Sequence, residues 1–234
     1  MQRLMVTILF VVLSQSAFAE GWGHLEGEIV LDGDIPEVRP LVNIGARNIP
    51  DDSIVIDRLT KGVANVCVYL PKVPEIHPDL DKPKVRPVKL SINNLRYDPR
   101  IAVVRTDQQI LVSNDSNFSH EIHTSPFVNP VSDAIVQPNR NLVIFYQIPE
   151  SLPVKVGSDT HPWMRAWWLV VDHPYATITN KQGKFRIEKL PAGEHTFRVW
   201  HERTGYIDRK LTVTIEADQT TRLRPIPVLT EDFK

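Results

Sequence analysis

The sequence predicts an all-β protein, and three observations carry this prediction. Apolar residues alternate with polar ones over several short stretches, as in 25–31, 88–92 and 211–215, and a period of two marks half-buried strands. Nineteen prolines, against ten glycines, interrupt the chain at short intervals. No stretch combines a helical period with capping residues. Short strands at this spacing are typical of β sandwiches.

The N-terminus predicts export. Met1-Gln2-Arg3 is short and positive, an apolar run extends from Leu4 to about Leu13, and Ala17-Phe18-Ala19 has the A-x-A pattern of a signal peptidase site. We therefore expect residues 1–19 to be a cleavable signal peptide and the protein to be periplasmic or secreted. The apolar run is shorter than the roughly 20 residues of a transmembrane helix. No other stretch is long enough, so we expect no stable membrane insertion after cleavage.

The composition argues against several partners. The chain has 27 Lys and Arg residues and 28 Asp and Glu residues, without a basic stripe, so we expect no nucleic-acid partner. The single cysteine, Cys67, cannot form a disulfide within the chain. It lies in the apolar run 63–70, which predicts a buried strand residue rather than a reactive thiol.

The pattern of strands and turns predicts two domains after the signal peptide. The first covers residues 20–171, with N-terminal strands in 24–70, a proline-rich connection over 71–87 and a core over 88–171. The second covers residues 172–234 and begins at Asp172-His173-Pro174, beyond which the pattern of strands and turns restarts.

Two short motifs bring histidine and methionine together. His120 and His123 follow a predicted strand over 110–112, and His161 and Met164 lie just before another over 167–171. Imidazole and thioether groups are soft ligands suited to copper, and loops at the end of a sandwich can aim them at one point. His123 is three residues from His120, so it faces the other way on an extended strand. We predict that it is not a direct ligand.

These motifs resemble the cupredoxin family, in particular its amicyanin and plastocyanin-like members. The ligand loop of amicyanins is Cys-x-x-His-x-x-Met with a proline after the histidine, and Ser158-x-x-His161-Pro162-x-Met164 keeps every spacing. The upstream His-Asn-Val-His pattern is matched by His120-Glu121-Ile122-His123, whose first histidine corresponds to the ligand. The resemblance covers about residues 88–171, and the wider pattern is similar to exported "methylamine utilization" proteins. It implies a Greek-key sandwich with His120, His161 and Met164 as copper ligands.

Two departures from the family pattern change the expected chemistry. Ser158 stands at the position of the cysteine thiolate, and a protonated hydroxyl is a weak ligand that gives no blue chromophore. The remaining neutral set favours Cu(I), whereas Cu(II) would recruit water or a carboxylate such as Asp159 or Glu121. Glu121 replaces the asparagine whose amide ties the two ligand loops together, so this tie is in question. We expect Glu121, His123 and Asp159 to lie around the ligands rather than among them.

The C-terminal part resembles the carboxypeptidase regulatory-like, or transthyretin-like, β-sandwich family. This family has a carbohydrate-binding-like fold and includes the domain attached to rhamnogalacturonan lyases. The resemblance lies in Asn180-x-x-Gly183, Phe185-x-Ile187 and Leu190-Pro191-Ala192-Gly193, residues that mostly serve folding. We expect Trp200 to pack against the neighbouring domain, the alternative being a platform for a sugar.

Two hypotheses of function follow, and Ser158 weighs directly against a third, a blue-copper electron carrier. In the first, the protein is an exported, non-enzymatic copper-binding protein that acts in copper handling or with a redox partner in an electron-transfer assembly. In the second, it is a degenerate cupredoxin without metal that recognises a polysaccharide or another protein. We reject a hydrolase built on Ser158 and His161, because the strand-to-helix elbow of a nucleophilic serine is missing.

Overall fold

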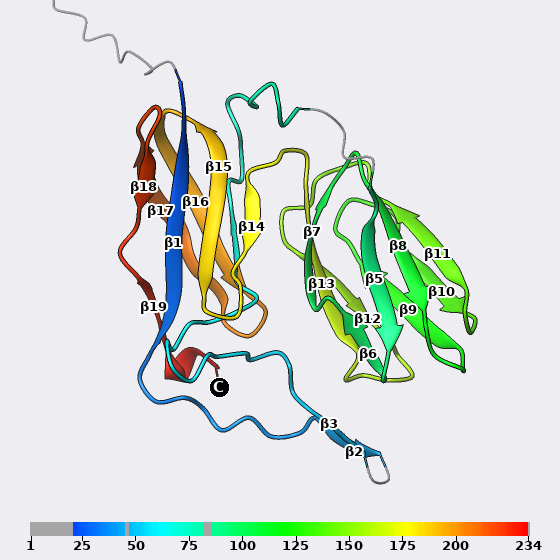
Figure 1. Cartoon of the computed structure of the whole chain (residues 1–234). Coiled ribbons are helices and arrows are strands. Elements are labelled where there is room, and N and C mark those ends of the chain that lie inside the picture. The colour runs from blue at the N-terminus through cyan, green and yellow to red at the C-terminus, as the bar shows by residue number, and fades with distance from the viewer. Residues whose placement is uncertain (1–20, 45–46, 82–85, 234) are drawn as a thin grey trace, which may run out of the picture.

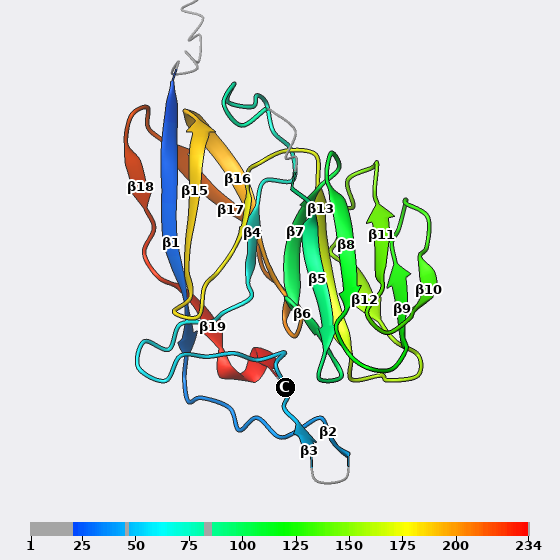
Figure 2. The same cartoon turned by 45° about the vertical axis from the view of Figure 1, so that its right-hand side comes forward.

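The chain folds into two β sandwiches that lie side by side (Figure 1, Figure 2). The structure is a computed structural model and describes residues 21–44, 47–81 and 86–233. Among these residues the regular elements are nineteen strands and one short 3-10 helix, η1 (Thr230–Phe233). The prediction of an all-β fold is confirmed.

The central sandwich is formed by residues 88–171. Its strands are β5 (Val88–Asn93), β6 (Arg96–Asp98), β7 (Ile101–Arg105), β8 (Gln109–Asn114), β9 (His120–Ser125), β10 (Asp133–Val136), β11 (Asn141–Phe145), β12 (Val154–Gly157) and β13 (Arg165–Val171). They form the sheets β10-β9-β12-β13-β7 and β11-β8-β5-β6. The pairs β5–β8 and β7–β13 are parallel, so the chain crosses between sheets as in the predicted Greek-key sandwich. Apolar residues from both sheets fill its core, Trp168, Tyr146 and Ile122 among them.

The terminal sandwich combines strands from both ends of the chain. Its strands are β1 (Trp22–Asp32), β4 (Cys67–Tyr69), β14 (Ala176–Ile178), β15 (Lys184–Pro191), β16 (Gly193–His201), β17 (Gly205–Ile215), β18 (Thr220–Arg222) and β19 (Ile226–Leu229). One sheet has the order β15-β1-β18, with β19 also paired to β1, and the other has the order β14-β4-β16-β17. A small hairpin of β2 (Val42–Ile44) and β3 (Arg47–Ile49) projects from the segment after β1.

The predicted domain boundaries are wrong in their N-terminal half. Residues 24–70 do not join the first domain, because β1 pairs with β15 and β4 pairs with β14 and β16. The proline-rich segment predicted within the first domain instead follows β4 of the terminal sandwich and precedes β5 of the central sandwich in the sequence. The reason is that Leu25, Ile29 and Leu31 fill the same core as Phe185 and Ile187. Alternation tells which side chains face a core, and it does not tell which sheet the strand enters.

Gly183 shows how tightly β1 is built into the terminal sandwich. Its φ of +77° lies in the left-handed region, and a Cβ atom there would lie 2.2 Å from the carbonyl oxygen of Ile29. Gly183 N–H donates to Asn180 O (2.9 Å), and Gly183 O accepts from Ile29 N (2.9 Å). Glycine is therefore required both for the turn over 180–183 and for the close approach of β1.

An apolar layer joins the two sandwiches. Its buried members are Cys67, Tyr69, Ile101, Leu169, Val171 and Trp200. Cys67 is the buried strand residue that was predicted, and burial raises the pKa of its thiol. The indole of Trp200 packs edge-on against Trp167 of β13, with ring centres 5.2 Å apart. Trp200 therefore packs between the sandwiches, as predicted, and is not available to stack on a sugar.

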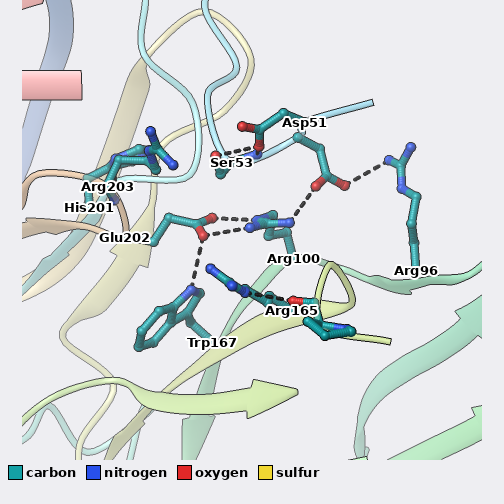
Figure 3. Close-up of polar contacts among 11 residues, drawn as sticks. Asp51, Ser53, Arg96, Arg100, Arg165, Trp167, His201, Glu202 and Arg203 are labelled. Carbon is teal, nitrogen blue, oxygen red and sulfur yellow. Dashed lines mark hydrogen bonds and ion pairs between the residues drawn. The ribbon is translucent and has the colours of Figure 1, made fainter. Parts of the chain in front are cut away.

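A buried ion-pair cluster lies beside this layer (Figure 3). The guanidinium of Arg100 from the central sandwich binds Glu202 of the terminal sandwich through two hydrogen bonds, of 2.5 and 2.7 Å, and also binds Asp52. Asp52 in turn pairs with Arg96 at 2.9 Å. The indole Nε1 of Trp167 donates to Glu202 at 3.1 Å. These contacts connect three segments that are far apart in the sequence.

The predicted signal peptide at 1–19 lies outside the described residues. Within 21–44, 47–81 and 86–233, no helix has the length and apolar character needed to cross a membrane.

Candidate metal centre

Two loops bring the predicted ligands to one end of the central sandwich. His120 is the first residue of β9, and His161 and Met164 lie in the connection between β12 and β13. That connection is closed by the pairing of Gly157 with Arg165 and by a hydrogen bond from Met164 N to His161 O (2.8 Å). Strand β12 also pairs with β9. Because Gly157 pairs with His123, the loop that follows Gly157 lies beside the first residues of β9, where His120 is located.

The imidazoles of His120 and His161 lie next to each other. Their ring centres are 5.9 Å apart, and their planes are inclined by 55°. Because metal–nitrogen bonds are about 2 Å long, two imidazoles that share a metal ion have ring centres roughly 5 to 6 Å apart. The observed spacing is therefore compatible with one ion between the rings.

The ring nitrogens of this pair are buried without partners. His120 is 1% exposed, and in the described part of the chain neither its Nδ1 nor its Nε2 has a hydrogen-bond partner. His161 Nδ1 is also buried and without a partner there. Burial, followed by the proximity of His161, lowers the pKa of His120, so its ring is neutral and keeps a lone pair for a metal near neutral pH. Unpaired buried donors and acceptors are costly, and a bound metal ion would remove that cost at one nitrogen of each ring.

Met164 and Ser158 are two other residues of the 158–164 loop that the sequence singled out. Met164 is 1% exposed and belongs to the core cluster of the central sandwich, so its thioether lies in an apolar environment. Ser158 is buried, and its hydroxyl donates to Glu121 Oε2 (3.2 Å) and accepts from His161 N (3.1 Å). The hydroxyl of Ser158 therefore orders the loop.

Glu121 ties the two loops together. Its Oε2 accepts hydrogen bonds from Ser158 Oγ (3.2 Å), Asp159 N (2.8 Å), Thr160 N (3.0 Å) and Thr160 Oγ1 (3.1 Å). The backbone N–H of Thr160, followed by the other donors, lowers the pKa of Glu121, so the side chain is a carboxylate at neutral pH. The sequence left open whether the two loops are connected by hydrogen bonds. The Glu121 carboxylate makes this connection.

Neighbouring residues that the sequence did not single out also hold the site. The hydroxyl of Tyr97 from β6 donates to the carbonyl groups of Glu121 (2.6 Å) and Gly157 (3.0 Å), which fixes both loops at their bases. The ring of Phe118 lies 4.6 Å from that of His120, and the indole of Trp163 lies 5.1 Å from the ring of His161. Of these three residues, only Trp163 could have been associated with the site from the sequence, because it lies two residues after His161 in the same loop.

His123 and Asp159 lie outside the pair of imidazoles. On β9, His120, Ile122 and Thr124 are buried whereas Glu121 and His123 are half-buried, so His123 is on the opposite face from His120. Its Nδ1 lies 3.8 Å from Asp133 Oδ2. Asp159 is exposed and contributes its backbone N–H to Glu121.

The donor set at this end of the sandwich is small. Among the described residues, no three His, Cys, Asp or Glu side chains converge on one point. A metal ion here would therefore depend on two imidazoles and a thioether. Such a neutral, soft set fits copper, and Cu(I) in particular, better than a hard cation.

Comparison with known proteins gives matches only among solved structures. No protein-family model matches the chain, and a search of curated proteins found no relative. An amicyanin from Paracoccus versutus is 12% identical, with a TM-score of 0.33, over 46% of this chain and 98% of that chain. A purple cupredoxin from Nitrosopumilus maritimus is 14% identical, with a TM-score of 0.31, over 36% and 98% of the two chains. A copper-containing nitrite reductase from Thermus scotoductus SA-01 is 14% identical, with a TM-score of 0.34, over 42% of this chain and only 27% of the reductase. Because these structural similarities are weak, the argument for a metal site depends on the geometry of His120 and His161.

Proposed function

We propose that this protein is an exported copper-binding protein of the periplasm or the cell exterior that holds Cu(I) through His120, His161 and Met164. The observation that carries the proposal is the pair of adjacent imidazoles, whose ring centres are 5.9 Å apart. Their buried ring nitrogens have no partner among the described residues. A bound copper ion would supply either a transferable ion or a one-electron redox couple. The role would be in copper handling or in an electron-transfer assembly, without catalysis by this chain.

Each residue of the site has a distinct part in this proposal. His120 stays neutral because burial lowers its pKa, and His161 is the more accessible of the two imidazoles. Met164 adds a soft donor that favours the reduced ion. Glu121 and Tyr97 hold the loops in register. Since Ser158 supplies no thiolate, we expect a colourless protein.

Competition for Cu(I) with a chromophoric chelator, without oxygen, tests this proposal. We expect the wild type to bind one Cu(I), and His120→Gln and His161→Gln each to weaken binding at least 100-fold, because each removes one of two strong donors. His123→Gln is the matched control and should change affinity less than threefold. Equal affinities in all four proteins, or no binding, would sink the proposal.

Replacement of Ser158 by cysteine sharpens the same test. In Ser158→Cys the thiolate would join the two imidazoles and the thioether, which is the donor set of a blue-copper site. We expect an intense visible absorption on addition of Cu(II) to this variant and none in the wild type. A colourless variant would show that the three donors do not share one ion.

A specific surface favours a second candidate, a protein-binding module. Strands β10 and β11 are the outer edges of the two sheets of the central sandwich, and apolar side chains are exposed along them and in the neighbouring loops. They are Phe127, Val128, Val131, Ile135, Val143, Phe145 and Ile148. Exposed apolar patches of this kind mark interaction sites. If no metal binds, loss of partner binding on Ile135→Lys would identify this role.

A further inference from the structure

A pocket of about 560 Å³ opens at the seam between the two sandwiches. Its wall contains the start of the β2–β3 hairpin, the segment 51–53, Arg100, the loop after His161, the start of β13 and the turn after β16. The side chains that matter for its chemistry are Arg165, Arg203, Trp163, Trp167, Arg100 and Glu202. Its volume lies within the range of about 300–1,000 Å³ that is usual for small-molecule sites.

The acidic groups of this pocket are already engaged. Glu202 accepts from Arg100 and from Trp167 Nε1, and Asp51 accepts from the backbone N–H and the hydroxyl of Ser53. A cationic ligand would therefore compete with three guanidinium groups of the lining for two carboxylates that already accept hydrogen bonds. Figure 3 shows these carboxylates pointing toward their partners.

Two arginines of the pocket, in contrast, have donors to spare. Arg165 Nε donates to the carbonyl oxygen of Pro162 (3.0 Å), and Arg203 Nη2 donates to that of Phe233 (3.3 Å). In the part of the chain that the structure describes, neither guanidinium contacts a carboxylate. A guanidinium carries five N–H donors in a planar fork that matches a carboxylate. The wall therefore presents two guanidinium groups that have no anionic partner among the described residues.

Two indoles give the pocket an apolar, planar side. Trp167 packs against Trp200 and is held by Glu202. Trp163 packs against His161, and its Nε1 is shielded from solvent without an acceptor among the described residues. Flat aromatic walls beside guanidinium groups suit a ligand that has a planar apolar body and an anionic group.

We infer that this pocket binds a small aromatic carboxylate, with Arg165 and Arg203 binding its anionic group and Trp163 and Trp167 contacting its ring. The inference does not depend on copper, although Pro162 and Trp163 belong to the loop that carries His161. It is therefore tested on the metal-free protein.

Benzoate and inorganic phosphate are the probes, measured by calorimetry and by tryptophan fluorescence at low salt. We expect benzoate to bind with a dissociation constant of about 1 mM or below, and Arg165→Gln and Arg203→Gln each to weaken binding at least tenfold. Both arginines are exposed, so unchanged thermal unfolding midpoints should confirm that the variants fold. Arg140→Gln, an exposed arginine of the central sandwich, is the control and should bind as the wild type does.

Three outcomes would overturn the inference. The first is no benzoate binding at 10 times the expected dissociation constant. The second is equal binding in all variants, which would place the ligand elsewhere. The third is binding of phosphate but not of benzoate, which would exclude the aromatic carboxylate as the class of ligand.

Discussion

Two buried polar clusters lie close together in this protein, and they differ in how completely they are paired. In the cluster between the sandwiches, Arg100 is bound by Glu202 and Asp52, and the Trp167 indole is bound by Glu202. At the end of the central sandwich, His120 has no partner on either ring nitrogen among the described residues. A cluster that satisfies itself stabilises the fold, whereas one that leaves donors unpaired is suited to bind something else. Two adjacent imidazoles with unpaired buried nitrogens mark the candidate site, whereas the ion pairs of Arg100 mark a structural cluster.

Breaking the paired cluster should give the largest effect. The side chains of Arg100 and Glu202 are 8% and 4% exposed, so Glu202→Ala leaves a buried guanidinium short of two hydrogen bonds. We expect the free energy of unfolding to fall by about 3–5 kcal/mol, measured by urea denaturation. Arg222→Ala breaks an exposed pair with Glu26 and should cost less than about 1 kcal/mol.

A double replacement tests whether the loss of stability in Glu202→Ala comes from the unpaired charge of Arg100. Arg100→Met combined with Glu202→Leu removes both charges, so it should recover most of the stability lost in Glu202→Ala. If the double variant is as unstable as Glu202→Ala, the loss comes from packing and not from an unpaired charge.

His201 is an exception within the paired cluster and predicts an effect of acid. It is fully buried, its Nε2 has no partner among the described residues, and burial, followed by Arg100 and Arg203, lowers its pKa from 6.5 to about 4. Between pH 6.5 and about 4 the unfolded chain therefore takes up a proton that the folded chain does not. The free energy of unfolding should fall by about 1 kcal/mol for each pH unit of acidification in this window.

His201→Gln isolates this contribution from the other groups that titrate in acid. Burial also lowers the pKa of His173, which adds a slope of the same sign in both proteins. Urea denaturation at pH 7, 6 and 5 should show a shallower dependence on pH in His201→Gln than in the wild type. Identical slopes would falsify the assignment to His201.

Removing the hydrogen bonds that Glu121 makes to the opposite loop should give a smaller effect, seen as weaker Cu(I) binding. Glu121→Ala removes the acceptor of four hydrogen bonds in the loop, and loss of such support typically weakens metal binding 10- to 100-fold. Glu121→Gln keeps an oxygen acceptor, so its loss of Cu(I) affinity should be smaller. Asp133→Ala, on the neighbouring strand, is the control. Unchanged Cu(I) affinity in Glu121→Ala would mean that the loops need no such tie.

The candidate ligands were named from the sequence through the resemblance of two motifs to a known ligand pattern. His120, His161 and Met164 could be named because spacing within one loop and proximity to a strand end are local properties. The alternation of apolar residues likewise predicted half-buried strands, and the continuous apolar run 63–70 predicted the buried state of Cys67. These features depend on neighbours within a few residues, which a sequence displays directly.

The tertiary structure decided which strands share a sheet and which charges share a partner. β1 joins β15 across more than 150 residues of chain, and Arg100 meets Glu202 over a separation of 102 residues. The sequence shows that Glu121 is acidic, and only the fold shows that its carboxylate holds the opposite loop. Pairings of this kind depend on the register of distant strands, and alternation sets the face of a side chain without naming the strand beside it.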